Sequence, residues 1–210
     1  MRATSILLLS AAFLLFASGA GAQQEDKLTI NVSRPIVVYG QSVTLSGAVP
    51  DQLTSVVLTV VAEPLGVAMP RSIGAFGPNV TGWHTVVKPR IRTVFRAATP
   101  TETSPPVVVQ VRPRVTLTRK RDVFEAKVVA GRPFVGRPVQ LQMLSRLGRW
   151  KAVRRGVLRK NPIKFRTNLP AKGRVRLRAF VPATRKQPGY LDGFSKPLVV
   201  ASAGRKSLLG

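Results

Sequence analysis

Most side chains of this sequence that could do chemistry are cationic. The chain has 34 basic residues, eight acidic residues and one histidine, which gives a formal net charge of +26. The clearest pattern is Arg174, Arg176 and Arg178, which alternate with Val175 and Leu177. In a β-strand this spacing puts the three guanidinium groups on one face and the apolar residues on the other. Arginine forks match phosphate and carboxylate oxygens, so the pattern predicts binding of a polyanion.

Further cations extend this candidate polyanion-binding surface. Lys164 and Arg166 flank Phe165 in another expected strand, which belongs to the opposite sheet of a sandwich. We expect the basic surface to wrap around the second half of the chain for this reason. The remaining candidates are expected at turns, and they are Arg119, Lys120, Arg121, Arg154, Arg155, Arg159 and Lys160.

The charge is divided unevenly along the chain. Residues 27–111 carry seven basic and three acidic side chains, whereas residues 112–210 carry 26 basic and three acidic ones. A large field of one sign attracts polyanions, and we expect an anionic cell-envelope polymer or polysaccharide. Nucleic acid ranks lower, because single-strand binders interleave aromatic residues with their cations. The alternative is a solvated, arginine-rich surface without a dedicated partner.

The sequence offers little for catalysis or metal binding. It has no cysteine, so it can form no disulfide and no thiolate metal site. His84 is the one histidine, and no nucleophile elbow, phosphate loop or His-Glu-x-x-His motif accompanies it. Asp51, Asp122 and Asp192 lie near expected turns and are too scattered for a calcium site. Trp150 fits a core or edge aromatic better than a sugar-stacking platform. We therefore expect a protein that is not an enzyme and holds no cofactor or metal.

The N-terminus has the pattern of a secretory signal peptide over residues 1–22. Arg2 precedes an apolar run from Ile6 to Ala17, and small residues follow, with cleavage expected between Ala22 and Gln23. The apolar run has 12 residues, too few for the ~20 that span a bilayer. We expect a secreted protein, extracellular or at the cell envelope, with no transmembrane span in the mature chain.

Short runs rich in β-branched residues must position the cations. They recur at the spacing of a β-sandwich and are separated by Pro and Gly. The expected strands of the first half are 28–32, 42–46, 56–61, 83–87, 92–97 and 107–111, with an irregular Gly- and Pro-rich stretch over 64–79. Those of the second half are 115–118, 123–129, 139–143, 162–167, 174–179 and 197–200.

The two sets of strands predict a tandem duplication. Residues 95–97 match residues 177–179, and residues 104–107 match residues 195–198. The predicted fold is all-β, with two tandem immunoglobulin-like antiparallel β-sandwich domains over 27–111 and 112–201, and a flexible tail over 202–210. The expected core of the first copy is Leu28, Ile30, Val43, Leu45, Val57, Val86, Val94 and Phe95. That of the second is Val115, Leu117, Phe124, Ala126, Val128, Val139, Leu141, Met143, Phe165, Val175, Leu177 and Val199.

Two segments carry a resemblance to a known family. Residues 39–47, Tyr-Gly-Gln-Ser-Val-Thr-Leu-Ser-Gly, resemble the start of bacterial immunoglobulin-like repeats. Residues 148–153, Gly-Arg-Trp-Lys-Ala-Val, resemble the middle of such repeats in secreted actinobacterial proteins, and the first copy has no clear counterpart. The resemblance implies an extracellular sandwich and no particular chemistry. It leaves open a structural spacer or adhesion-type pair that binds a protein partner, with the charge incidental.

Overall fold

Strands make up nearly all of the regular structure in the part of the chain that the structure describes. A computed structural model describes residues 27–167, 173–184 and 188–202, and these form an all-β protein, which confirms the predicted class. Their helical structure is one 3-10 turn, Asp51–Leu53, and no described helix has the length and apolar character of a membrane span. The expected signal peptide and its cleavage point lie outside the described residues. Of the expected tail, Ser202 ends the last strand, and residues 203–210 lie outside the described ranges.

The first half, residues 27–112, folds into two sheets. One sheet has the strand order β1-β3-β6 and is antiparallel throughout. The other has the order β2-β8-β7-β4-β5, in which β2 and β8 run parallel and the remaining neighbours run antiparallel. The strands are β1 (Asn31–Val32), β2 (Ile36–Val38), β3 (Val43–Ala48), β4 (Leu58–Pro64), β5 (Arg71–Phe76), β6 (Gly82–Val87), β7 (Thr93–Ala98) and β8 (Val107–Arg112).

The second half, residues 113–202, also folds into two sheets. One has the order β13-β10-β9, and the other has the order β12-β11-β14-β15, with β16 also paired to β14. The strands are β9 (Arg114–Lys120), β10 (Val123–Val129), β11 (Pro138–Leu144), β12 (Trp150–Val157), β13 (Ile163–Arg166), β14 (Gly173–Val181), β15 (Gly193–Phe194) and β16 (Leu198–Ser202).

The strand orders of the two halves correspond. The sheet β1-β3-β6 matches β9-β10-β13, and the run β8-β7-β4-β5 matches β16-β14-β11-β12. A register shift falls at the same point in both halves, after Val60 in β4 and after Leu141 in β11, and these two residues pair with Ala97 and Ala179. In this correspondence β5 of the first half is the equivalent of β12 in the second half. The expectation that 64–79 is irregular was therefore wrong for Arg71–Phe76, and residues 150–153, which lie in β12, do have a counterpart in the first half.

Two buried serines repeat the same contacts in each half. The Ser104 hydroxyl accepts a hydrogen bond from the Ala97 amide at 3.0 Å, and the Ser195 hydroxyl accepts one from the Ala179 amide at 3.0 Å. Each serine amide in turn donates to the carbonyl of the same alanine. The serines thus bridge the last part of each half to β7 or β14, because a side chain can satisfy buried backbone groups that the ladder does not.

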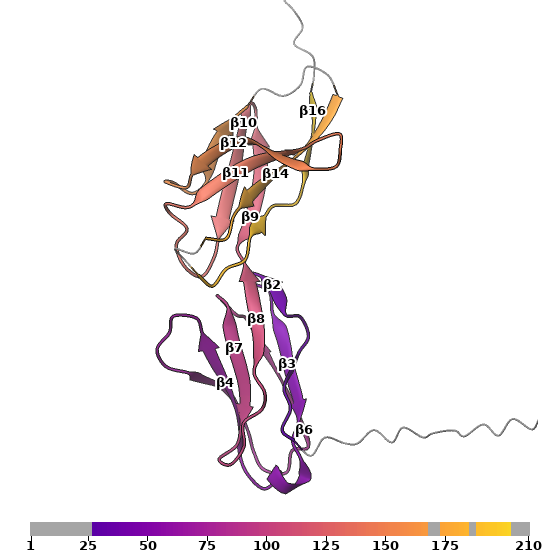
Figure 1. The fold of residues 1–210 in the computed structure, drawn as a ribbon, viewed down its shortest axis with the longest axis vertical. Coiled ribbons are helices and arrows are strands. Elements are labelled where there is room, and N and C mark those ends of the chain that lie inside the picture. Colours follow the sequence, from indigo (N-terminus) through magenta and orange to yellow (C-terminus); the bar gives the residue numbers. More distant parts are fainter. Residues whose placement is uncertain (1–26, 168–172, 185–187, 203–210) are drawn as a thin grey trace, which may run out of the picture.

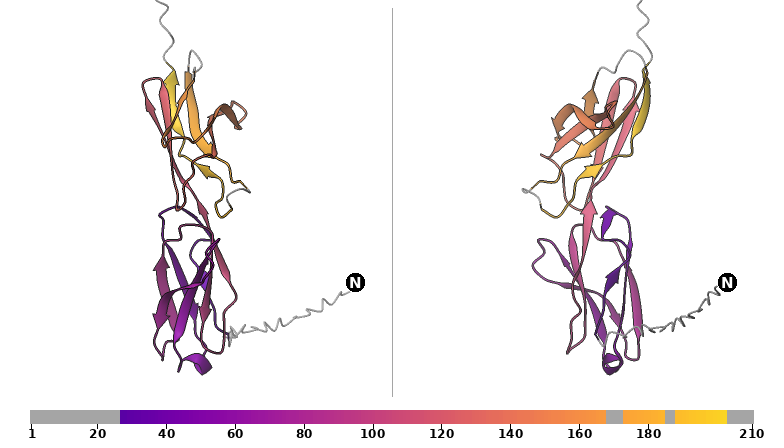
Figure 2. Two further views of the ribbon diagram at one scale, coloured as in Figure 1. Left: turned by 90° about the vertical axis from the view of Figure 1, so that its left-hand side faces the viewer. Right: turned by 45° about the vertical axis from the view of Figure 1, so that its right-hand side comes forward.

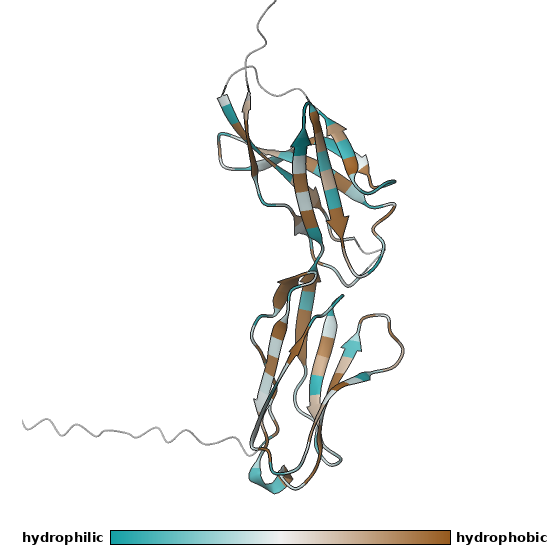
Figure 3. Cartoon of the chain, turned by 180° about the vertical axis from the view of Figure 1, so that it is seen from behind, coloured by the Kyte–Doolittle hydropathy of each residue, from teal (hydrophilic) through white to brown (hydrophobic). Residues whose placement is uncertain are grey.

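Most of the expected core is buried, but Val94, Met143 and Val175 are only half-buried, and three further valines are exposed. Val57, Val86 and Val199 are 50%, 63% and 56% exposed. In the runs 56–58 and 198–200, consecutive apolar residues give no alternation that could fix which residue faces inward, and Leu58 and Val200 take the inner positions. In β6 the buried indole of Trp83 sets the phase, which turns Val86 outward. Figure 3 shows the resulting bands of apolar and polar residues along β9 and β10.

The two halves lie end to end, as Figures 1 and 2 show from three directions. Pro113 alone separates β8 from β9, so the connection between the two halves is very short. The segment 188–192 of the second half reaches back to the first. Its Tyr190 hydroxyl donates to the Arg90 carbonyl at 3.0 Å, and the Gly189 carbonyl accepts from the Arg92 amide at 2.9 Å. A Cβ at Gly189, where φ is +106°, would lie 2.6 Å from the Ile91 side chain, so the close approach requires glycine.

Candidate functional site

The alternation along β14 places its arginines as the sequence predicts. Leu177 and Ala179 are fully buried, Val175 is half-buried, and Arg174 and Arg176 are exposed on the outer face of the sheet. The strand forms with this phase because its inward residues are apolar and its outward residues are charged. Two free cations therefore stand side by side on β14, at positions that a polymer passing over the sheet could contact.

Arg178 differs from its two neighbours because the surrounding side chains hold it. Its Nε donates to Gln142 Oε1 at 2.8 Å, and its guanidinium carbon lies 4.4 Å from the Trp150 ring centroid. The same carbon lies 5.5 Å from the ring centroid of Phe194. The guanidinium carbon of Arg112 also lies near this ring, 5.2 Å from its centroid. Burial lowers the pKa of the Arg178 guanidinium. This stack supports the sheet, and Arg178 has less freedom to bind a ligand than Arg174 and Arg176.

The pairing register shows which other residues share this outer face. Gln142 lies across from Arg178, and Phe180 lies between Gln140 and Phe194. No Asp or Glu occurs in β11, β12, β14, β15 or β16. The same register also places the apolar residues Leu144, Ala152, Val199 and Ala201 on this side. We call the polar and aromatic part of this surface the arginine face, and it consists of Gln140, Gln142, Trp150, Arg155, Arg174, Arg176, Arg178, Phe180 and Phe194.

Arg154 and Arg155 lie in β12, so the expectation that they occupy a turn was wrong. Their neighbours in the sequence are small or apolar residues that extend the strand, which pairs with β11. Arg155 is exposed, opposite Gln140 on the arginine face. The Arg154 Nε donates to the Arg166 carbonyl at 3.0 Å, and this bond connects β12 to β13 of the other sheet. Trp150 is half-buried at the start of the same edge strand, which agrees with its interpretation as an edge aromatic.

Lys164 and Arg166 point outward from β13, on the sheet opposite the arginine face, as expected. This second surface is partly neutralised. The Glu125 carboxylate of β10 forms ion pairs with the Lys120 ammonium, 3.1 Å away, and with the Lys164 ammonium, 3.7 Å away. The opposite sheet therefore presents less unpaired charge than the number of its lysines indicates.

The remaining candidates lie at or near turns. Arg119 and Lys120 end β9, so the turn expected for all of 119–121 begins two residues later, at Arg121. Arg121 occupies the turn itself with φ of +52°, and its carbonyl accepts from the Arg119 Nε at 2.8 Å. Arg159 and Lys160 are exposed in the loop before β13, where they were expected.

His84 is exposed in β6, opposite Ser46 of β3. Within residues 27–167, 173–184 and 188–202, no group of three His, Asp or Glu side chains could hold a metal ion. Asp51 begins the 3-10 turn, and Asp192 accepts from the Ala183 amide in a loop. The Asp192 carboxylate thus satisfies a backbone group of the loop, as short polar side chains commonly do.

A cavity of about 470 Å³ lies at the junction of the two halves, and sequence reasoning did not find it. Residues of β4 to β7 line it from the first half, and Gly131, Arg132 and Tyr190 line it from the second. Tyr190 is buried and packs edge-to-face on Phe134 at 5.1 Å. Burial raises the pKa of the Tyr190 hydroxyl, although its hydrogen bonding with the backbone of Arg132 and Gly131 opposes this rise.

Comparison with known proteins assigns no family to this chain. No protein-family model matches the chain, and the comparison with curated proteins found no match. The fold defines the class of the protein: it is an all-β sandwich that occurs twice along one chain.

Proposed function

We propose that the protein is a secreted, non-enzymatic module at the cell envelope, and that its basic second half binds an anionic polymer or polysaccharide. The observation that carries the proposal is the arginine face. Its five strands contain no carboxylate, while Arg155, Arg174 and Arg176 are exposed on it. Exposed guanidinium groups without an internal partner attract phosphate or carboxylate groups from solution.

The geometry favours an extended ligand over a small one. The cations lie along the sheet rather than around a hollow, and neighbouring strands in a sheet are about 4.8 Å apart. A polymer that carries a regular series of anions can cross several strands and meet one cation after another. The Phe194 ring, which is 48% exposed, adds apolar surface beside the cations, which suits sugar units.

Charge reversal tests the proposal directly. Residues 23–210 retain every described residue and are suitable for the measurement. The double variant Arg174→Glu/Arg176→Glu should bind poly(glycerol phosphate) or polygalacturonate at least about tenfold more weakly than the unchanged chain. The two polymers distinguish phosphate from carboxylate as the preferred anion.

The matched control changes the net charge equally in the first half. Lys27→Glu/Arg34→Glu replaces two exposed cations, at positions away from the arginine face. This variant should bind within about twofold of the unchanged chain. Equal losses in both double variants would mean that the total charge acts without a defined face.

A protein partner is the second candidate, and an open sheet edge supports it. β5 is the terminal strand of its sheet and pairs with β4 only, and its one charged residue is Arg71. An exposed strand edge accepts another strand through main-chain hydrogen bonds. Binding by this route would persist at high salt and would survive charge reversal on the arginine face.

A further inference from the structure

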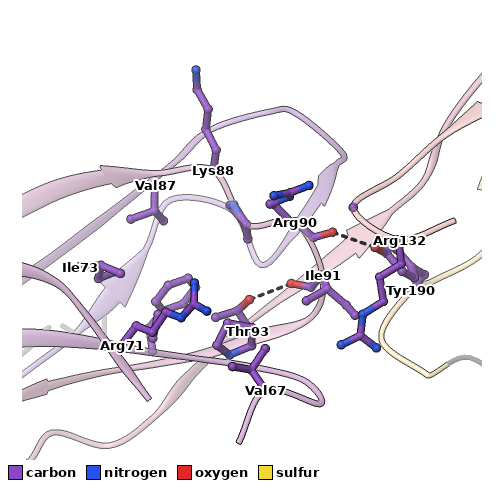
Figure 4. A pocket seen from close by; sticks show the side chains of 15 residues that line it. Val67, Arg71, Ile73, Val87, Lys88, Arg90, Ile91, Thr93, Arg132 and Tyr190 are labelled. Carbon is purple, nitrogen blue, oxygen red and sulfur yellow. Dashed lines mark hydrogen bonds between the residues drawn. The ribbon is translucent and has the colours of Figure 1, made fainter. Parts of the chain in front are cut away.

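The junction cavity has apolar walls made mostly by the first half. Side chains from the ends of four strands and their loops converge there, and Figure 4 shows them around a common space. Phe95 and Ile91 are buried, and Ile73 and Val87 are half-buried. With a volume of about 470 Å³, the cavity falls within the range of ~300–1,000 Å³ that is common for small-molecule sites.

Cationic side chains lie around these apolar walls, and no acidic side chain is among the lining residues. The polar lining includes Arg71, Lys88, Arg90 and Arg132, and none of the lining residues is Asp or Glu. In Figure 4 Lys88 extends away from the other side chains, which leaves three arginines nearest the walls. Glu63, the carboxylate closest in sequence, forms an ion pair with Arg96 instead of lining the cavity.

Contacts between the halves hold the cavity in shape. The Arg132 Nη2 donates to the Leu65 carbonyl at 2.8 Å, and the Tyr190 hydroxyl donates to the Arg90 carbonyl at 3.0 Å. A Cβ at Gly131 would lie 2.6 Å from the Arg90 carbonyl, so the approach of the two halves is close on this side. A preformed cavity binds a ligand without the cost of ordering its walls.

We propose that this cavity binds a single-chain amphiphile with an anionic headgroup. The alkyl chain occupies the apolar space between Ile73, Val87 and Phe95, and the carboxylate or phosphate meets the arginines at the rim. Charge complementarity selects the anion, because an ammonium headgroup would face arginines with no carboxylate among the lining residues. The site uses none of the residues of the arginine face, so it does not depend on the proposed polymer binding.

Titration calorimetry of residues 23–210 with four decyl compounds tests the proposal. Decanoate and decyl phosphate carry the two possible anions, decyl glucoside is neutral, and decyltrimethylammonium is cationic. At about 0.3 M salt, which suppresses binding to the general positive surface, we expect one molecule of at least one anion per chain. The neutral and cationic compounds should bind at least about tenfold more weakly. The better of the two anions identifies the headgroup.

Two kinds of variant locate the binding in the cavity. Ile73→Trp fills the cavity and should abolish binding. If this variant does not fold, Val87→Phe fills the same cavity from β6 instead of β5. Arg71→Gln/Arg90→Gln removes two rim charges and should weaken anion binding about three- to tenfold. The matched control Lys27→Gln/Arg34→Gln removes two exposed charges that do not line the cavity and should leave affinity unchanged.

Three results would overturn the proposal. They are equal affinity for the neutral and anionic compounds, anion binding that both filling variants retain, and an equal loss in the cavity and control charge variants. Failure here would leave the polymer proposal intact, because charge reversal at Arg174 and Arg176 changes neither the cavity walls nor its rim.

Discussion

Arg178 should contribute to stability, whereas its neighbour Arg176 should not. Replacing Arg178 by alanine removes the hydrogen bond to Gln142 and the contact with the Trp150 ring. The hydrogen bond contributes about 0.5–1.5 kcal/mol, and a cation over an aromatic ring at a partly exposed site contributes about 0.5–1 kcal/mol. Desolvation of the guanidinium opposes part of this gain, since burial lowers the pKa of Arg178. We expect Arg178→Ala to lower the free energy of unfolding by about 1–2 kcal/mol.

Urea denaturation followed by far-UV circular dichroism measures this loss. Arg176→Ala is the matched control, because its side chain is exposed on the same strand, and it should change the free energy of unfolding by less than about 0.5 kcal/mol. A double-mutant cycle of Arg178→Ala with Trp150→Leu isolates the stacking contribution. Equal stability of the two alanine variants would refute the reasoning and would place Arg178 among the free cations of the arginine face.

Two further predictions concern the buried polar groups. Ser195→Ala and Ser104→Ala each remove the acceptor for a buried alanine amide, and each should cost about 1–3 kcal/mol in urea denaturation, whereas Ser55→Ala at an exposed turn should cost less than about 0.5 kcal/mol. A null effect in only one of the two buried positions would contradict their equivalence. The raised pKa of Tyr190 means that the folded state favours the neutral phenol, so stability is intact below the ordinary value of 10.0 and falls as pH rises above it. Denaturation between pH 8 and pH 11 should show a smaller alkaline loss in Tyr190→Phe, and an identical loss would be inconsistent with this assignment.

The positions of most strands could be predicted from the sequence, but β2, β5, β12 and β15 were not among the expected strands. For some of the others the phase could not be predicted. Alternation in 174–179 fixes both the strand and its outward arginines, because the side-chain period of a strand is two residues. In 56–58 every residue is apolar, so local sequence cannot decide between Val57 and Leu58, and packing of the whole sheet decides. β5 was not predicted for a different reason. The Gly and Pro residues around it indicate a loop, whereas its pairing with β4 makes it a strand.

The candidate site was predictable in its charge and only partly in its geometry. The excess of arginine in the second half is visible in the composition. The outward direction of Arg174 and Arg176 follows from their alternation with apolar residues. The stack of Arg178 on Trp150 depends on the register of β11 between β12 and β14, which no local pattern encodes. The junction cavity depends on how segment 188–192 meets the first half, and that placement arises only from the packing of both halves.

The salt dependence of polymer binding tests the central proposal most directly. The affinity of residues 23–210 for poly(glycerol phosphate) and for polygalacturonate would be measured from about 50 mM to about 500 mM salt. We predict that the logarithm of the dissociation constant of the better ligand rises linearly with the logarithm of the salt concentration. Engagement of two to five cations corresponds to a slope of about 1.5–3.5, by analogy with single-stranded polyanions. A dissociation constant that does not change over this range, or no binding at the lowest salt, would contradict the proposed function.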